Sequence, residues 1–440
     1  MIKRFKSFSE LISAQESNDC IFSYLKEGQI ASISYGELLE KVHKYPLPKE
    51  DVVGLFISNN IESIIALFAL ASKKQLIILD PNEREESLIK KIKATHVGHI
   101  LFGDEELRDI LTPHLEVNYH TEDKDILFFT SGTTSESKAV VLTEQTLCNA
   151  TFNGGSLLPL TKEDKLLAVL PLSHVFGLVC SILWPISFGA TVCLGNGLRQ
   201  IFTDFALYKP TVTTLVPEMA KFLVFNKLFN NELSLILIGA GSCDDMTINA
   251  IKALGIRLSY GYGLTESSSG IALSLHDNPR AMSICPDYKV RIAEDGEIIV
   301  KSNTTLMKGY YNDPKSTEAT LIDGELHTGD LGKIEDGCLF ITGRKKEILV
   351  FGDGSKLYIP EYEAKLLSLL GPGCDFCILQ NAKGQVILYI YKPIDVENIV
   401  DEFNKTQSRS HKIEKIIYAK DKLPRTGTGK VMKYLIKVED

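Results

Sequence analysis

Short apolar runs alternate with amphipathic segments along the first part of the chain. Residues 52–57 and 76–79 are apolar runs typical of buried strands, and Asn60 caps the amphipathic segment that joins them. Residues 85–94 show a second helical pattern. Further short apolar runs follow at 99–102, 125–129, 233–238 and 257–260. Strands that alternate with helices in this way predict an α/β fold with parallel sheets.

A long stretch without charge lies between Lys165 and Arg199. Residues 166–194 are apolar enough to raise the question of a membrane span. However, Pro171, Pro185 and several glycines interrupt the stretch, and proline removes a helical hydrogen bond. We therefore predict a strand, a turn, a buried helix and a second strand inside a folded core, and no membrane span.

The pattern changes after about residue 286 to short β-like runs separated by Asp-Gly turns. A charged patch, Arg344-Lys-Lys-Glu347, then precedes a stretch with two helical patterns and two apolar runs. We predict a large N-terminal α/β domain over 1–343, which includes a β-rich subdomain at about 286–343. A small α+β domain is predicted over 344–440.

The composition is that of a globular protein, with 44% hydrophobic and 24% charged residues. The 48 basic and 56 acidic residues give a formal net charge of −8. This balance argues against a general surface for nucleic acids or anionic membranes, so an anionic ligand needs a dedicated pocket. No apolar segment of sufficient length follows the basic N-terminus before Glu10, and we predict a cytoplasmic protein without a secretion signal.

The nine cysteines are scattered and odd in number, which favours reduced thiols. Cys374 and Cys377 form a CxxC pair, but the sequence has no second pair at zinc-finger spacing. A metal or redox role for this pair is therefore not expected.

The most informative segment runs from the apolar strand ending at Phe129 into a loop of hydroxyl-bearing residues and glycine. Small side chains, backbone amides and one lysine suit the oxygens of a polyphosphate. The spacing is not that of a Walker A loop, and the alternative is an ordinary surface turn. The candidate phosphate-binding residues are Thr130, Ser131, Gly132, Thr133, Thr134 and Lys138.

A second segment, Ser259-Tyr-Gly-Tyr-Gly-Leu-Thr-Glu266, combines glycines, an aromatic side chain and a carboxylate. Gly263 permits close approach of the backbone to a ligand, Tyr262 offers a ring for a base, and Glu266 offers oxygen ligands for a divalent cation. The alternative is a glycine-rich connection without a ligand.

Two further segments place charge beside glycine. Asp330, in His327-Thr-Gly-Asp330, suits ribose hydroxyls, and Arg344, after Gly343, suits phosphates. Pro424-Arg-Thr-Gly-Thr-Gly-Lys430 is a flexible loop that delivers one lysine. Taken singly, these segments also fit a surface turn, a surface arginine and a solvated tail.

Taken together and in this order, the segments resemble the adenylate-forming superfamily of acyl-CoA synthetases, luciferases and peptide-synthetase adenylation domains. Residues 171–177 and 307–314 complete the pattern, which covers the chain from about residue 50 to its end. The local likeness is greatest to fatty-acyl and aryl-CoA ligases, through 171–177 and 343–352. The resemblance implies a mobile C-terminal domain, and ATP and Mg²⁺ as cofactors.

By this resemblance the loop at 130–138 would hold the β- and γ-phosphates of ATP. Tyr262 would pack on adenine, Thr265 would bond the α-phosphate, and Glu266 would ligate Mg²⁺. The loop departs from the family pattern, because Thr134-Ser-Glu-Ser-Lys138 lacks the usual glycine and proline and adds a negative charge. A lower affinity for phosphate is therefore expected.

Further residues receive roles from the same resemblance. Asp330 would bind the ribose hydroxyls, and Arg344 would support the ribose or a phosphate. Lys430 would bridge the substrate carboxylate and the α-phosphate. Lys346 would be the hinge about which the small domain rotates between adenylation and thioester formation. His174, within 171–177, is a further candidate catalytic residue, with a packed core histidine as the alternative.

These observations predict ATP-dependent activation of a carboxylic acid to acyl-AMP, with release of pyrophosphate. The acyl group would then pass to a thiol of coenzyme A or of a carrier-protein phosphopantetheine. Val175 and Phe176 stand where amino-acid-activating relatives carry an aspartate, so a fatty or aryl acid is expected. The altered loop leaves a non-catalytic nucleotide- or acyl-binding relative as the alternative. A phosphoryl-transfer kinase is disfavoured, because no glycine loop of kinase or Walker spacing occurs.

Overall fold

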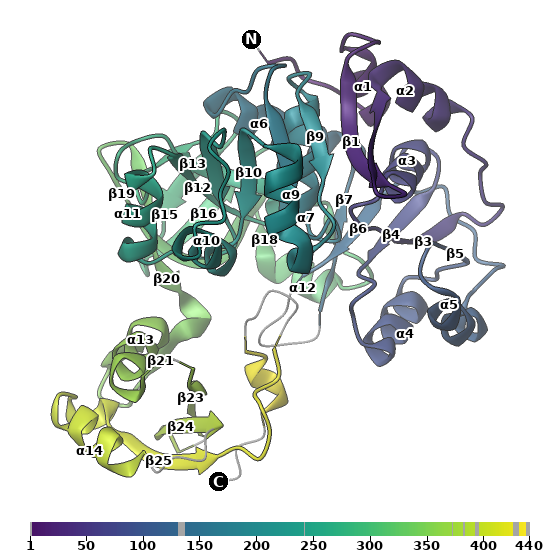
Figure 1. Cartoon of the computed structure of the whole chain (residues 1–440). Helices are drawn as coiled ribbons and strands as arrows, with labels where there is room; N and C mark the ends of the chain where they lie inside the picture. Colours follow the sequence, from purple (N-terminus) through teal and green to yellow (C-terminus); the bar gives the residue numbers. More distant parts are fainter. Residues whose placement is uncertain are drawn as a thin grey trace.

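Two β-sheets of different size carry most of the chain (Figure 1). The computed structural model describes residues 2–130, 137–241, 243–371, 373–381, 383–391, 396–425 and 431–436. Within these ranges the larger sheet has 14 strands and the second has six. Two smaller sheets lie in the C-terminal part.

The larger sheet is parallel at its centre and antiparallel on one side. Strands β8 to β12 are joined by parallel pairs, whereas β12, β13, β14, β20, β19, β16 and β15 follow one another in antiparallel pairs. The strand order is β15 (Lys289–Ile292), β16 (Glu297–Lys301), β19 (Glu325–Glu335), β20 (Cys338–Arg344), β14 (Met282–Ile284), β13 (Ser269–Ser274), β12 (Arg257–Leu264), β11 (Leu235–Ile238), β10 (Val212–Leu215), β8 (Lys165–Ala168), β9 (Thr191–Leu194), β1 (Cys20–Lys26) and β2 (Gln29–Ser34), with β18 (Leu321–Ile322) beside β19.

The six-stranded sheet begins with the strand–helix–strand unit that the apolar pattern predicts. Strands β3 and β4 are buried along their whole length, as uninterrupted apolar runs require. Helix α3 (Ile61–Leu70) follows Asn60, whose side chain accepts a hydrogen bond from the Ser63 N–H. The strand order is β17 (Gly309–Tyr310), β7 (Ala139–Leu142), β6 (Ile126–Phe129), β4 (Gln75–Leu79), β3 (Val52–Phe56) and β5 (His99–Leu101).

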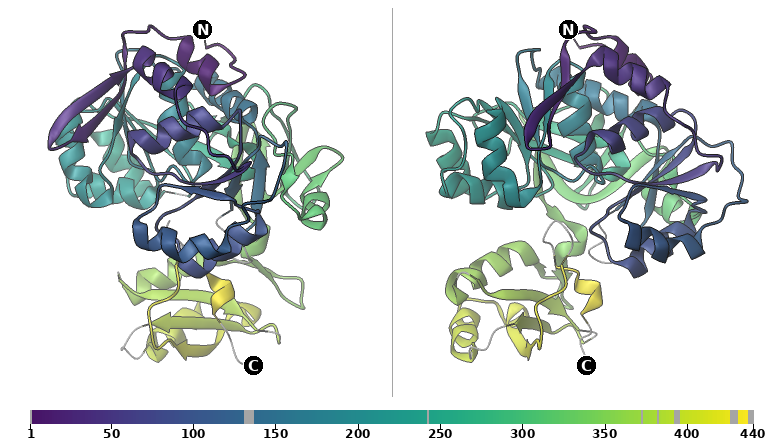
Figure 2. Two further views of the ribbon diagram at one scale, coloured as in Figure 1. Left: turned by 90° about the vertical axis from the view of Figure 1, so that its right-hand side faces the viewer. Right: turned by 45° about the vertical axis from the view of Figure 1, so that its right-hand side comes forward.

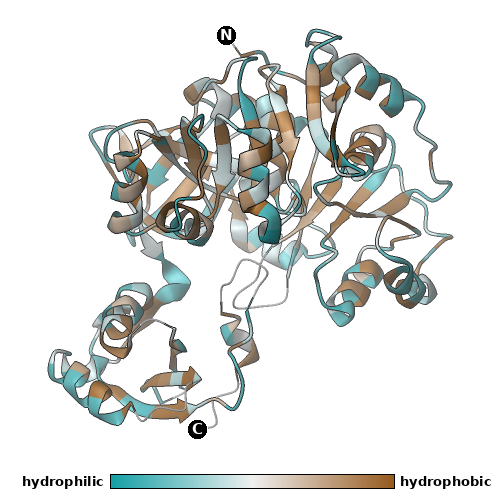
Figure 3. Ribbon diagram, in the orientation of Figure 1, coloured by the Kyte–Doolittle hydropathy of each residue, from teal (hydrophilic) through white to brown (hydrophobic). Residues whose placement is uncertain are grey.

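Helices cover the faces of both sheets, and the strands between them are mostly hydrophobic (Figure 3). Helix α4, predicted at 85–94, has these bounds in the structure. Its inward residues Leu88 and Ile92 are fully buried, in keeping with the helical period. The helices of this part include α4 (Glu85–Ala94), α5 (Glu105–Leu111), α6 (Glu144–Leu157), α9 (Ile201–Tyr208), α10 (Pro217–Phe225), α11 (Asp245–Ala253) and α12 (Pro314–Thr320).

The stretch without charge folds in the predicted order of strand, turn, buried helix and strand. After β8 come α7 (Val175–Leu178), a π-helical turn at Val179–Leu183, α8 (Trp184–Ile186) and then β9. The indole N–H of Trp184 donates to Leu158 O at 3.0 Å, so this buried ring has its polar atom satisfied. In the ranges that the structure describes, no helix has the length and apolar character needed to cross a membrane.

The hydrophobic pattern predicts no elements before residue 52, yet this segment is built into the main core. It contributes α1 (Phe8–Ser13), α2 (Tyr35–His43) and the hairpin of β1 and β2. Strand β1 lies parallel to β9, with Phe22 opposite Val192. The two terminal nitrogens of the Arg4 guanidinium group also donate to Asp287, at 2.6 and 2.5 Å, which ties the N-terminal segment to the region before β15.

The C-terminal part has a hydrophobic core of its own and lies to one side of the two large sheets (Figure 2). Its core includes Tyr362, Leu366, Ile378, Leu388 and Phe403. Its elements are β21 (Ile348–Val350), β22 (Lys356–Tyr358), α13 (Ile359–Leu370), β23 (Asp375–Gln380), β24 (Val386–Tyr391), α14 (Glu397–Lys405) and β25 (Ile413–Tyr418). The arrangement is the predicted α+β one, and the boundaries at 286 and 343 stay predictions.

Candidate active site

The two ends of the candidate phosphate loop meet at the end of the β6–β7 hairpin. Phe129 pairs with Ala139 as the last step of the ladder. The Thr130 N–H donates to Lys138 O at 2.9 Å, and the Lys138 N–H donates to Thr130 Oγ1 at 3.1 Å. The predicted residues Ser131, Gly132, Thr133 and Thr134 lie outside the described residues. The structure therefore fixes where the loop starts and ends.

Tyr310 connects Lys138 with Glu266. The Lys138 Nζ lies 4.7 Å from the centroid of the Tyr310 ring, within the range of a cation–π contact. The Tyr310 hydroxyl donates to Glu266 Oε1 at 2.7 Å. Burial raises the pKa of Tyr310, and the neighbouring Glu266 charge raises it further. The structure thus brings together two predicted residues that are far apart in the sequence.

The surroundings of Glu266 fit a magnesium ion that arrives with a nucleotide. Glu266 is half-buried, and Tyr310 occupies one of its carboxylate oxygens. Among the described residues there is no cluster of three or more histidine, cysteine, aspartate or glutamate side chains that would hold a metal alone. Mg²⁺ is commonly bound by one or two carboxylates together with substrate phosphates and water. Glu266 is the residue that would hold it here.

A second group is formed by Tyr262, Asp330 and Arg344. The Tyr262 hydroxyl donates to Asp330 Oδ2 at 3.0 Å, and Arg344 Nε lies 2.8 Å from Asp330 Oδ1. Asp330 and Arg344 face each other as a pair in the β19–β20 ladder. Burial raises the pKa of Tyr262, and the Asp330 charge adds to this effect. The three residues predicted around adenine and ribose therefore lie in one place.

Gly263 and Thr265 lie between these two groups in the sequence. The strand pairing of β12 with β13 is irregular between Tyr262 and Gly263. A Cβ atom at Gly263 would lie 1.7 Å from Ser269 O, so no other residue fits at this position without a shift of the backbone. Thr265 then begins the short helix η4 (Thr265–Ser267) that carries Glu266.

His174 is placed on another element and has different neighbours. It precedes helix α7, and its side chain makes no capping hydrogen bond. Burial lowers the pKa of His174, while the nearby Asp80 charge acts in the opposite direction. Behind it the Phe176 ring fills the space above Gly239, where a Cβ atom would lie 2.7 Å from the ring. The catalytic role of His174 stays a prediction.

The predicted hinge residue Lys346 is exposed in the short helix η5 (Lys345–Glu347) that follows β20. Lys345 before it pairs with Asp295 and Glu297, at 2.6 and 2.7 Å. Lys430 lies outside the described residues. The chain on either side of its loop is held by a bridge between Arg425 and Val431.

Sequence reasoning missed Tyr310 and Glu297 as residues of the site. Tyr310 lies in the quoted stretch 307–314, but its contact with Glu266 requires β17 to pair with β7, which no local pattern reveals. Glu297 follows an Asp-Gly turn, which suggested only a strand start.

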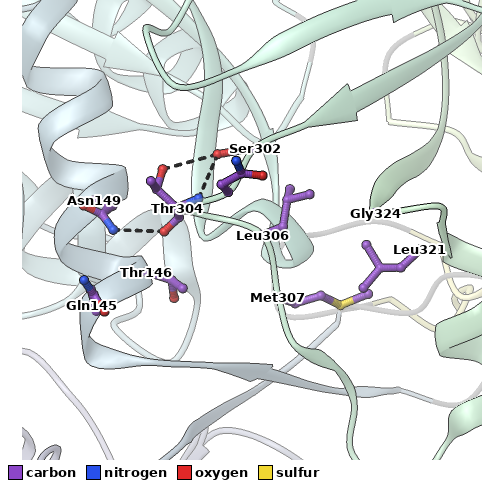
Figure 4. A pocket seen from close by; sticks show the side chains of 10 residues that line it. Gln145, Thr146, Asn149, Ser302, Thr304, Leu306, Met307, Leu321 and Gly324 are labelled. Carbon is purple, nitrogen blue, oxygen red and sulfur yellow. Dashed lines mark hydrogen bonds between the residues drawn. The ribbon is translucent and has the colours of Figure 1, made fainter.

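A hollow in the surface lies beside the site, between α6 and the segment 302–307 (Figure 4). Asn149 points across it and donates from Nδ2 to Thr304 O at 3.0 Å. Its lining contains none of the predicted site residues, although the N–H of the lining residue Met307 donates to Glu266 O at 2.9 Å. We therefore place the candidate nucleotide site at the two side-chain groups and not in this hollow.

Comparison with known proteins agrees with this geometry. Residues 71–311 match the protein family described as AMP-binding enzyme. The 2-succinylbenzoate–CoA ligase of Listeria monocytogenes is 25% identical, over 98% of this chain and 93% of that protein. The oxalate–CoA ligase of Arabidopsis thaliana is 26% identical, over 83% of this chain and 78% of that protein.

The fold is also that of a solved structure. The O-succinylbenzoate coenzyme A synthetase of Bacillus subtilis, in complex with ATP and a magnesium ion, superposes with a TM-score of 0.82 at 20% identity. The superposition covers 98% of this chain and 99% of the other. The predicted α/β architecture with a small C-terminal domain is thereby confirmed.

Proposed function

Because the chain belongs to the AMP-binding enzyme family, we propose that it is an AMP-forming acid–thiol ligase. It activates a carboxylic acid with ATP to acyl-AMP, releases pyrophosphate, and transfers the acyl group to a thiol. The observation that carries this proposal is the position of the segment 262–266, which contributes Tyr262 to one group of side chains and Glu266 to the other.

The chemistry requires two anions, the carboxylate and the α-phosphate, to come within bonding distance. Lys138 supplies a fixed positive charge at the phosphate end, and Lys430 would supply another at the reacting atoms. Glu266 would hold Mg²⁺, which would neutralise further charge on the phosphates. Asp330 and Arg344 orient the nucleotide through its ribose, so that the α-phosphate faces the acid.

We infer that the acid is a fatty or aryl acid. Val175 and Phe176 are apolar, and the Phe176 ring packs directly on the backbone at Gly239. A buried ammonium group without a carboxylate partner would cost several kcal/mol, roughly 3 or more, which disfavours an amino acid. The acceptor thiol that the relatives' names support is coenzyme A. The phosphopantetheine of a carrier protein is the alternative acceptor.

An exchange assay tests this function. Radiolabelled pyrophosphate is incubated with ATP, Mg²⁺ and the protein in the presence of single fatty, aryl, dicarboxylic and amino acids. We expect exchange into ATP only with a carboxylic acid present, and its loss in Glu266→Gln. If the protein binds ATP but no acid in the panel supports exchange, the non-catalytic alternative replaces this function. Free coenzyme A and a carrier protein are then compared as acceptors.

A further inference from the structure

Glu297 is a buried carboxylate beside the candidate ribose site. It is the first residue of β16, is 6% exposed, and pairs with Leu331 of β19. A buried carboxylate is costly unless hydrogen bonds and cations satisfy it. The hydrogen-bond and ion-pair partners of Glu297 therefore indicate the role of its carboxylate.

One oxygen of Glu297 fixes the irregular step in the β16–β19 pairing that lies just before Asp330. The Gly329 N–H donates to Glu297 Oε1 at 2.8 Å. Gly329 has a φ of +70°, a left-handed conformation that glycine adopts without strain. The Asp330 N–H donates to Thr328 Oγ1 at 3.1 Å, and Thr328 in turn donates to Ile298 O at 2.7 Å. The direction of the Asp330 carboxylate depends on this irregular step in β19.

The other oxygen of Glu297 binds Lys345, which directly follows strand β20, and His327 on the adjacent strand β19. Glu297 Oε2 lies 2.7 Å from Lys345 Nζ and 3.1 Å from His327 Nδ1. Asp295 provides a second carboxylate for Lys345, at 2.6 Å. Lys345 directly follows Arg344 in the chain. Its ion pair with Glu297 therefore restrains the backbone at Arg344.

From this geometry we propose that Glu297 and Lys345 are positioning residues, which hold Asp330 and Arg344 in register for the ribose hydroxyls of the nucleotide. Glu297 supports Asp330 through Gly329 and supports Arg344 through Lys345. Neither residue is assigned a contact with the nucleotide. The inference rests on the proposed function, because it assumes that Asp330 is the residue that binds the ribose.

The preference for ATP over 2′-deoxy-ATP tests the proposal. Glu297→Gln keeps an oxygen for the Gly329 N–H and nearly the same volume, but it removes the charge that Lys345 faces. We expect the KM for ATP to rise about tenfold while the KM for the acid stays constant, since a charged hydrogen-bonded pair is lost. The preference for ATP over 2′-deoxy-ATP is expected to fall by a similar factor, because the ribose contact is already weakened. A purely structural defect would affect both nucleotides equally.

Lys345→Met is the second variant, since it removes the cation and leaves the buried carboxylate bound to Gly329. It is expected to show both effects, the higher KM for ATP and the lower preference for ATP over 2′-deoxy-ATP. It therefore provides the test even where Glu297→Gln does not fold. Lys333→Met is the matched control, because it breaks an exposed pair with Glu335 elsewhere on β19. It is expected to change neither KM nor the preference.

An unchanged preference between the two nucleotides in a folded Glu297→Gln or Lys345→Met would overturn the inference. Calorimetric binding of ATP and 2′-deoxy-ATP gives the same comparison without catalysis. A wild-type protein that binds ATP with the ribose preference, but makes no acyl-AMP, would refute the function and leave the positioning role standing.

Discussion

Tyr310 is the residue on which the phosphate end of the site depends most directly. Its ring lies under the ammonium group of Lys138, and its hydroxyl holds one oxygen of Glu266. The other oxygen of Glu266 is then presented in a defined direction. Phenylalanine at this position would keep the ring and its cation–π contact and remove only the hydrogen bond.

We expect Tyr310→Phe to raise the Mg²⁺ concentration needed for half-maximal pyrophosphate exchange roughly threefold to tenfold, because a hydrogen bond to a charged group is lost. The measurement is a magnesium titration at saturating ATP and acid. Tyr311→Phe is the control, since the Tyr311 hydroxyl lies 3.4 Å from that of Tyr119 and away from Glu266. An identical magnesium requirement in both variants would separate Tyr310 from the metal site.

Residue types and spacing, taken together with the family resemblance, indicated Lys138, Glu266, Asp330 and Arg344 as candidate site residues. The structure places them in two compact groups. The residue that links Lys138 with Glu266, Tyr310, was not predictable from the sequence. Tyr310 reaches Glu266 only because a two-residue strand pairs with a distant hairpin, and such a pairing leaves no periodic pattern in the sequence.

At the scale of elements, the β12–β13 pair carries both halves of the site and has little freedom. Gly263 and Gly270 face each other across this pair. The two glycines differ sharply in their surroundings. A Cβ atom at Gly263 would collide with the backbone at Ser269, whereas a Cβ atom at Gly270 would have no neighbour within 4 Å.

We predict that Gly263→Ala lowers the free energy of unfolding by roughly 2–4 kcal/mol and weakens ATP binding, since the backbone at Ser269 must move. Gly270→Ala is expected to change stability by less than about 1 kcal/mol. Urea denaturation of both variants, with the wild type, measures the difference. Equal stability of the two variants would contradict the close approach seen at Gly263.

The N-terminal segment is attached by an ion pair whose strength depends on pH. The hydrogen bonds from Arg4 lower the pKa of Asp287 to about 2, despite the opposing effect of burial, and Thr304 and Asn153 contribute further bonds. A carboxylate with a lowered folded-state pKa stabilises the fold above its unfolded pKa of about 4. This contribution is lost as the pH falls from about 4 towards 2.

Arg4→Met is therefore expected to destabilise the protein by about 1 kcal/mol at pH 7, after allowance for solvent screening of the half-exposed arginine. The difference from wild type should shrink as the pH is lowered below about 4. Urea denaturation at pH 7, 5 and 3 measures it. Arg291→Met removes an exposed pair with Glu325 and serves as the control. A difference that grows at low pH would contradict the assignment.

Elements with long uninterrupted apolar runs, such as β3 and β4, were predicted because full burial leaves a strong signal. The elements before residue 52 were missed for the opposite reason. Helix α1 has only six residues, and β1 alternates only weakly between buried and exposed positions. Their place in the core depends on contacts with distant segments, such as β9.

At the scale of the whole molecule, the two large sheets and the small C-terminal part are joined where β20 leaves the larger sheet. Lys345 is bound to Asp295 and Glu297, whereas Lys346 is exposed. A rotation of the C-terminal part would therefore change the backbone dihedral angles at Lys346 and not those of the residues before it. This geometry supports the proposed hinge.

Lys346→Pro is expected to leave acyl-AMP formation largely intact and to block thioester formation, because proline fixes the φ angle that a hinge must change. The two half-reactions are measured separately, as pyrophosphate release and as transfer from supplied acyl-AMP. Lys346→Ala, which keeps the backbone free, is the matched control. Undiminished transfer by the proline variant would remove Lys346 from the hinge.

The contact between Gly343 and Tyr358 has a consequence for the predicted rotation about Lys346. Tyr358 follows Lys346 in the chain, and its ring occupies the place of a side chain at Gly343, where a Cβ atom would lie 2.6 Å from Cε2. The predicted rotation about Lys346 moves the ring away from Gly343, so an added methyl group is expected to penalise only the arrangement described here. A change of about 1.4 kcal/mol would shift the ratio of the two arrangements tenfold.

Gly343→Ala is expected to enrich the rotated form, which is measured by fluorescence energy transfer between labels on the two parts. Gly352→Ala, which meets no atom within 4 Å, should leave the ratio unchanged.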